Sequence, residues 1–298
     1  MNLLHLQYFK ALAEKEHLFR TANELYISPS ALSTSISRLE AELGVRLFDR
    51  VGRNIRLNEN GKRFHQRVKN ALDELELGKF EIRQAGEEGT AALKVATSTH
   101  VLWEEAFAEF VRKNRNVSFS HHTVTLPQLS NSSQMMQYDF IITALADMST
   151  AEYEYEILFN DSPMLVVYAE HPWAGREQIS LSEAKDEPFV TLTKDFSARR
   201  YFDTLCSLAG FTPHIVAQGD YELRTRLIKK HIGITVTTAM GAAALPAEGL
   251  RFIRITEPIH SRVQAIFWKK SCKLTPHAES FKDMMVDHYQ PISRTAPA

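Results

Sequence analysis

The segment SPSALSTSISRLE, residues 28–40, constrains this chain most, because it joins a helical pattern to an outer face of short hydroxyl side chains. Ser28 is a suitable N-cap, and Pro29 takes the first helical position, where its missing N–H removes no hydrogen bond. Leu32 and Ile36 begin a stripe of apolar residues at spacings of four and three, which predicts one buried face. The outward face is expected to carry Ser30, Ser33, Thr34, Ser37 and Arg38.

This outer face suits a DNA groove. A helix that enters the major groove, about 12 Å wide, must bring its backbone close to the base edges, and short side chains permit that approach. Hydroxyl groups can also bond bases or phosphates. Two amphipathic helices, at about 3–16 and from Leu18 to Leu25, precede the segment, so a helix-turn-helix is predicted. Because the turn holds no glycine, an ordinary three-helix bundle with a solvated serine-rich face stays the alternative.

A basic hairpin is predicted next, over LFDRVGRNIRL at residues 47–57, where Gly52 and Asn54 suit a tight turn. Its arginines would make it a wing beside the recognition helix, because a tip arginine can enter a narrow minor groove. Residues 1–72 hold 12 Lys and Arg against 7 Asp and Glu, whereas the remainder holds 23 against 29. This asymmetry favours nucleic acid as a partner of the first part alone, with a solvated charged face as the alternative. The wing arginines are Arg50, Arg53 and Arg56.

A long helix is predicted from Glu59 to Gln84, with Asn58 as its N-cap. Its apolar positions follow heptad spacing, which predicts a seam that pairs with a second copy of the chain. Packing on its own chain is the alternative. The segment QAGEEGTAA, residues 84–92, is expected to be the hinge. The seam residues are Phe64, Val68, Ala71, Leu75 and Ile82.

From Leu93 on, short apolar runs alternate with amphipathic stretches, which predicts mostly parallel sheets covered by helices. Ligands of such sheets bind outside the carboxyl ends of the strands. LKVATSTH runs from a strand into Ser98 and Thr99 before a helix, and hydroxyls beside a helix N-terminus favour a small anion, often a carboxylate. Simple capping of the helix is the alternative. Strands are expected at 93–97, 117–124, 140–144, 164–169, 189–192, 215–217, 233–237 and 263–268.

Several other classes of protein lack their sequence signals. His121 and His122 would point to opposite faces of a strand, and Cys206 and Cys272 match no metal or redox spacing, so no metal site is expected. The chain shows no glycine-rich phosphate loop and no nucleophile turn, so neither a cofactor nor a catalytic residue is predicted. No apolar run is long enough for a membrane helix, the start does not resemble a secretion signal, and a reducing cytoplasm is the expected location.

Residues 20–61 resemble the N-terminal signature of LysR-type transcriptional regulators. The resemblance implies a helix-turn-helix from Leu18 to Ser37 and a dimer-linking helix after it. Two departures stand out: Pro29-Ser30 replaces a frequent Gln-Pro, and Leu18-Phe19 replaces the usual Phe-Thr. The matching residues are Ala22, Leu25, Ser28, Ala31, Leu32, Ser33, Ile36, Leu39, Glu40, Leu43, Gly44, Leu47, Phe48, Arg50, Arg53, Leu57 and Gly61.

The resemblance continues more loosely through Asp139–Ile142, His171-Pro172, Ala209–Pro213 and Gly233-Ile234. It implies an effector domain similar to periplasmic binding proteins, with two α/β subdomains and an inducer in the cleft between them. Thr237-Thr238 stands where the family often has a proline, so that wall of the cleft differs. By resemblance the effector contacts are Ser98, Thr99, Thr193, Ser197 and Thr237.

The predicted fold is therefore an α/β chain with a winged helix-turn-helix at 1–58, a linker helix and hinge at 59–90, and an effector domain at 91–290. Within the effector domain, subdomain 1 is expected at about 91–162 and 263–290, and subdomain 2 at about 163–262, with a disordered tail at 291–298. The predicted DNA contacts are Ser28, Pro29, Ser30, Ser33, Thr34, Ser37, Arg38, Arg50, Arg53 and Arg56.

The predicted function is a regulator that binds double-stranded DNA in a sequence-specific way and responds to a small molecule, with a small carboxylate favoured. The alternatives are a thiol redox-sensing regulator, or a binding protein or enzyme with a basic dimerisation head. The other expected partners are a second or further copies of the chain, as homodimer or homotetramer, and RNA polymerase. No membrane partner is expected.

Overall fold

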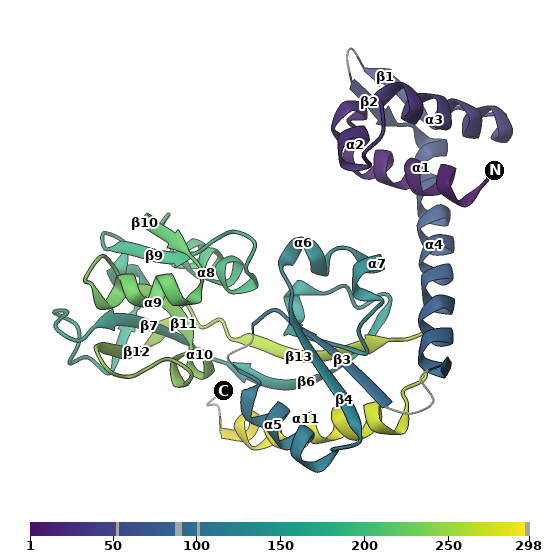
Figure 1. Cartoon of the computed structure of the whole chain (residues 1–298). Coiled ribbons are helices and arrows are strands. Elements are labelled where there is room, and N and C mark those ends of the chain that lie inside the picture. The colour runs from purple at the N-terminus through teal and green to yellow at the C-terminus, as the bar shows by residue number, and fades with distance from the viewer. Residues whose placement is uncertain (52–53, 87–90, 100–101, 296–298) are drawn as a thin grey trace. The chain divides into compact units, whose positions relative to one another are not determined.

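The computed structural model describes residues 1–51, 54–86, 91–99 and 102–295 (Figure 1). The chain divides into two compact units, residues 1–86 and 87–298, each with its own core. Among the described helices, none is long and apolar enough to cross a membrane.

The first unit begins with three helices whose ends are set by local hydrogen bonds. Asn2 caps the first helix, and the Ser28 hydroxyl accepts from the Ala31 N–H at 3.1 Å at the start of the third. Gly44 ends the third helix with a φ of 67°, a left-handed conformation that glycine adopts readily. The predicted stripe is confirmed, because Leu32 and Ile36 are both buried. The helices are α1 (Leu3–Lys15), α2 (Leu18–Glu24) and α3 (Pro29–Leu43).

The predicted hairpin is present as β1 (Phe48–Val51) paired antiparallel with β2 (Asn54–Leu57). Glu40 of α3 fixes its base, because one carboxylate oxygen accepts from the N–H of Leu47 at 2.7 Å and of Phe48 at 3.2 Å. The third helix and the wing are thus held as one rigid piece.

The long helix α4 spans Glu59–Gly86, and the Asn58 side chain accepts from the Gly61 N–H at 2.9 Å. A side chain at Gly61 would lie 2.1 Å from the Leu47 carbonyl oxygen, so only glycine lets α4 pack this closely on the wing. The predicted seam divides into two parts. Phe64 and Val68 pack in the core of their own unit, so the alternative of packing on the same chain holds for them.

The rest of the predicted seam faces solvent in the single chain. Ala71 is exposed, and Leu75 and Ile82 are 50% and 75% exposed. Apolar side chains at helical spacing remain available on this half of α4.

The second unit contains a five-stranded sheet in the order β4-β3-β5-β13-β6. Alternate residues of its strands face opposite sides: Phe140 and Ile142 pack under α5 and α11, while Ile141 packs under the short helices α6 and α7. The elements are β3 (Ala91–Thr97), β4 (Val117–Thr123), β5 (Phe140–Ala144), β6 (Tyr153–Asp161), β13 (Arg262–Lys269), α5 (Glu104–Lys113), α6 (Leu126–Leu129), α7 (Ser132–Met135), α11 (Pro276–Thr295) and the 3₁₀ turn η1 (Leu145–Asp147).

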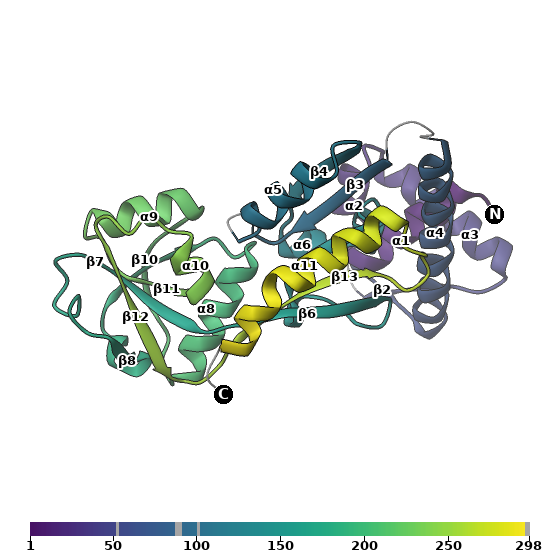
Figure 2. The same ribbon diagram turned by 90° about the horizontal axis from the view of Figure 1, so that it is seen from below.

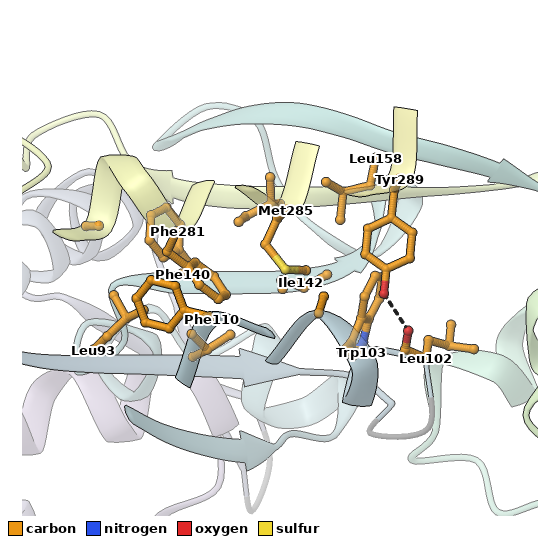
Figure 3. Packing of buried hydrophobic residues seen from close by; sticks show 14 of the residues in the cluster. Leu93, Leu102, Trp103, Phe110, Phe140, Ile142, Leu158, Phe281, Met285 and Tyr289 are labelled. Atoms are coloured by element: carbon orange, nitrogen blue, oxygen red, sulfur yellow. Dashed lines mark hydrogen bonds between the residues drawn. The ribbon is translucent and has the colours of Figure 1, made fainter. Parts of the chain in front are cut away.

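Helices α5 and α11 lie side by side on one face of this sheet, as Figures 1 and 2 both show. Trp103, Phe281 and Tyr289 fill the space between helices and sheet (Figure 3). The Tyr289 hydroxyl donates to the Leu102 carbonyl oxygen at 2.7 Å, which ties α11 to the loop before α5.

The remaining strands form a four-stranded sheet, β11-β7-β12-β8, and a parallel pair, β9 and β10. Helix α8 covers one face of the four-stranded sheet, and residues of α9 pack on the other. The elements are β7 (Pro163–Tyr168), β8 (Gln178–Ser180), β9 (Pro188–Leu192), β10 (His214–Gly219), β11 (Thr235–Thr238), β12 (Leu250–Glu257), α8 (Ser197–Leu208), α9 (Tyr221–Lys229), α10 (Ala239–Ala243) and η2 (Leu181–Ala184).

Two features differ from the sequence prediction. The sheets are mixed: the predicted strands β13 and β11 pair antiparallel with β5 and β7, and the unpredicted strands β6 and β12 pair antiparallel with β13 and β7. Helix α11 reaches Thr295 and so covers residues 291–295 of the segment predicted to be disordered, since packed turns around Tyr289 let the helix propagate. Residues 296–298 lie outside the described part.

Candidate DNA interface and effector site

The outer face of α3 presents the predicted polar residues. Ser28, Ser30, Thr34, Ser37 and Arg38 are exposed, whereas Pro29 and Ser33 are half-buried. The Ser28 hydroxyl is used as the N-cap and also lies 3.0 Å from the Ser30 hydroxyl, so the first turn is fixed before any DNA binds.

The wing is described in part. Arg56 is exposed on β2, Arg50 belongs to β1, and Arg53, the predicted tip residue, lies outside the described residues. The first unit therefore combines an exposed hydroxyl helix edge with a basic hairpin, as a groove reader requires.

In the second unit, the carboxyl ends of β3 and β5 meet at one edge because the two strands are parallel neighbours. Strand β3 leads into Ser98 and Thr99, and β5 leads into η1 with Asp147. The Thr143 hydroxyl joins the two ends, since it lies 2.8 Å from the Ser98 hydroxyl and 3.2 Å from the Asp147 carboxylate.

Ser197 approaches the same point from the other sheet. It begins α8, and its hydroxyl donates to the Asp147 carboxylate and accepts from Arg262. Arg262 itself lies 3.7 Å from the Asp147 carboxylate, and Arg200 of α8 pairs with it as well. An internal carboxylate thus lies beside Ser98 and Ser197, near the positive end of the α8 dipole.

Asp147 is a residue that the sequence analysis missed. Its side chain is only 3% exposed, and its partners are Arg262 on β13 of its own sheet and Ser197 and Arg200 on α8 of the other subdomain. Nothing in the run FIITALAD separates it from a surface aspartate. Ser197 and Arg200, which bond its carboxylate, lie 50 and 53 positions further along the chain.

A cavity of about 50 Å³ lies between the two sheets beside this contact. Of the five predicted effector residues, Thr99 and Thr237 line it, whereas Ser98 and Ser197 bond the groups just described. Thr193 is half-buried at the end of β9, where its N–H donates to the Gly219 carbonyl oxygen at 3.0 Å.

Arg224 of α9 also lines the cavity and was missed by the sequence analysis. It is 4% exposed, and burial lowers the pKa of its guanidinium, an effect that Tyr221 opposes. The sequence position of Arg224 could have identified it as a cavity residue. Arg224 follows the carboxyl end of β10 and lies one helical turn before the buried Ile228, on the inward face of α9.

The two cysteines are not arranged as a redox switch. Cys206 is fully buried in the core of α8, and burial raises the pKa of its thiol to about 12. Cys272 follows β13 in the other subdomain, and neither cysteine forms a disulfide. Because the thiolate is the reactive form, burial disfavours reaction at Cys206.

These features define a class: a DNA-binding regulator with a ligand-binding α/β domain. Two family models match the chain, "Bacterial regulatory helix-turn-helix protein, lysR family" over residues 3–62 and "LysR substrate binding domain" over residues 84–290. The chain belongs to the LysR family of transcriptional regulators.

Several named relatives agree. The chain is 32% identical over 291 residues to YybE of Bacillus subtilis, an HTH-type transcriptional regulator, covering 95% of this chain and 98% of that one. It is 26% identical to the transcriptional dual regulator GltC of Bacillus subtilis, covering 99% of both. A mutant of OxyR from Corynebacterium glutamicum has the same fold, with a TM-score of 0.60 at 19% identity over 98% of this chain and 93% of that one.

Proposed function

We propose that this regulator reads its operator with the outer face of α3, with residues Ser28, Pro29, Ser30, Ser33, Thr34, Ser37 and Arg38, and with the wing arginines Arg50, Arg53 and Arg56. The observation that supports this most is the exposed hydroxyl edge of α3, held against the wing by Glu40. Its short side chains let the helix backbone approach base edges. The protein acts on chromosomal DNA in the cytoplasm, with RNA polymerase as a further partner.

Salt dependence tests this function. Full-length protein should bind the DNA upstream of its own gene with an affinity that falls steeply as salt rises, because each neutralised phosphate releases counterions. With about six phosphate contacts, the dissociation constant should rise roughly 1,000-fold between 50 and 200 mM salt. An electrophoretic mobility-shift assay measures the dissociation constant at each salt concentration, and absence of binding at 50 mM salt would remove the DNA-binding proposal.

The proposed assembly pairs two copies through the exposed half of α4. Dimerisation matters because it places two recognition helices about one DNA turn, or a multiple of it, apart. The exposed Leu75 and Ile82 support this proposal, since two large apolar side chains on one helical stripe suit a partner helix. Both a homodimer and a homotetramer can be built on such a pair.

Leu75→Glu combined with Ile82→Glu should weaken self-association at least about tenfold, because two carboxylates replace the apolar contact. Analytical ultracentrifugation measures the effect. The matched control is Gln66→Glu with Asn70→Glu, two exposed positions whose spacing places them on the opposite side of α4. Equal self-association of the two double variants would assign the dimer contact to another surface.

The effector is proposed to bind in the cavity between the two α/β subdomains. Subdomain 1 consists of residues of about 91–162 and 263–290, and subdomain 2 of residues of about 163–262. Thr99 and Thr237 contact the effector directly in this proposal, and Ser98, Thr193 and Ser197 complete the site when the subdomains rearrange. Small-molecule sites prefer such a junction, where polar groups of two sheets converge.

A further inference from the structure

The most unusual group in the effector cavity is the guanidinium of Arg224. It is buried, and its Nε has no hydrogen-bond partner among the described residues. Its one described interaction is a cation–π contact, with the guanidinium carbon 5.3 Å from the centre of the Tyr221 ring. An isolated buried charge is strongly unfavourable, so a group of this kind calls for a counter-ion.

The carboxylates on and at the start of α9 are engaged elsewhere, and Asp161, beside the cavity residue Thr238, accepts from the Met240 N–H at 3.0 Å while burial raises its pKa and favours the neutral form. Asp220, one helical turn earlier, caps α9 by accepting from the Leu223 N–H at 2.8 Å. Glu222 pairs with Arg226. In the cleft itself, Asp147 bonds Arg200 and Arg262, so the other arginine that lines the cavity already has its counter-ion.

The cavity walls limit what the missing counter-ion can be. Apolar surface from Leu102, Val236 and Leu245 faces the same space as the hydroxyls of Thr99 and Thr237. A volume of about 50 Å³ holds roughly four water-sized groups, at about 10–15 Å³ each. One unpaired cation, two hydroxyls and an apolar wall match a small anion with one charge and one apolar end.

We propose that Arg224 is the residue that selects the charge of the effector, and that the effector is a short monocarboxylate whose carboxylate pairs with this guanidinium. This inference rests on the proposed effector cavity. Arginine suits the role because its fork of N–H donors matches a carboxylate in geometry as well as charge. The binding of the anion also neutralises the buried cation, so ligand binding should stabilise the second unit.

The test is isothermal titration of the full-length protein with acetate, propionate, butyrate, lactate and pyruvate, against propionamide and inorganic phosphate at equal ionic strength. At least one monocarboxylate should bind, while propionamide and phosphate should not. Arg224→Gln should raise its dissociation constant about 10- to 100-fold, the range expected for a charged hydrogen-bonded pair. The control Arg226→Gln, on the same helix with a side chain 70% exposed, should bind as the unchanged protein does.

A second readout separates ligand binding from a structural role. Arg224→Met should raise the melting temperature of the ligand-free protein by about 2–4 °C, because it removes an uncompensated buried charge. A fall in melting temperature would assign Arg224 a structural role and overturn the proposal. The proposal would also be overturned if no monocarboxylate binds, or if the Arg224→Gln variant binds the monocarboxylate as tightly as the unchanged protein.

A mobility-shift assay separates a failure of this inference from a failure of the proposed DNA-binding function. Arg224→Gln without ligand should bind DNA as the unchanged protein does, since the substitution lies outside residues 1–86. If DNA binding persists and a neutral molecule occupies the cavity equally well in both proteins, the charge-selecting role fails while the regulator function stands.

Discussion

Ser37→Glu is expected to abolish operator binding, raising the dissociation constant at least about 100-fold, because it places a carboxylate where α3 meets the phosphates of DNA. Ser37 is exposed on the outer face of α3, next to Arg38 and opposite the buried Leu39 stripe. A glutamate there is also longer than serine, so it would hold the helix away from the base edges. Mobility shift at 50 mM salt measures the loss.

Two controls make the result specific. Gln7→Glu adds the same charge at an exposed position of α1 and should weaken binding only slightly, through the net charge of the unit. Circular dichroism should show unchanged helix content and unfolding temperature for both variants, since exposed substitutions away from caps change stability little. A normal footprint from Ser37→Glu would mean that another surface reads the operator.

The sequence was most informative where interactions are local. The Ser28 cap, the Gly44 terminus and the buried stripe of α3 each depend on residues within a few positions, and all were predicted. The heptad pattern of α4 could not show which apolar residues the same chain would cover: the predicted Ala71 is exposed, whereas Leu72, outside the predicted seam, is buried. Phe64 and Val68 are covered by α1 and its neighbours, which lie some fifty positions away.

The effector domain shows the same limit more strongly. The strands with continuous apolar runs, such as β5 and β7, were predicted, whereas β6 and β12, which mix exposed and buried residues, were missed. General rules for α/β sheets predicted effector contacts at Ser98 and Thr99, at a strand end and a helix start, and the effector site stays a prediction. Its charges were not predicted, because Asp147 and Arg224 acquire their roles from partners in other elements.

Asp147→Asn is expected to reduce the free energy of unfolding of the second unit by about 3 kcal/mol, because it leaves the buried Arg262 without its carboxylate partner. The side chains of Asp147 and Arg262 are only 3% and 6% exposed, so solvent screens this pair little. Asp161, which pairs in register with Arg262, limits the loss, although burial raises the pKa of its carboxyl and favours the neutral form. Asparagine keeps the shape and its amide oxygen can still accept from Ser197, while its NH2 group then faces Arg200, so the substitution removes the charge and one acceptor.

Urea unfolding followed by tryptophan fluorescence isolates this effect, because all three tryptophans, Trp103, Trp173 and Trp268, belong to the second unit. Asp186→Asn, at an exposed position of the same unit, should change stability by less than about 0.5 kcal/mol. The double variant of Asp147→Asn and Arg262→Gln should recover part of the loss, since neither buried charge then lacks a partner. A coupling energy below about 0.5 kcal/mol would show that Asp147 and Arg262 do not stabilise this end of the five-stranded sheet as a pair.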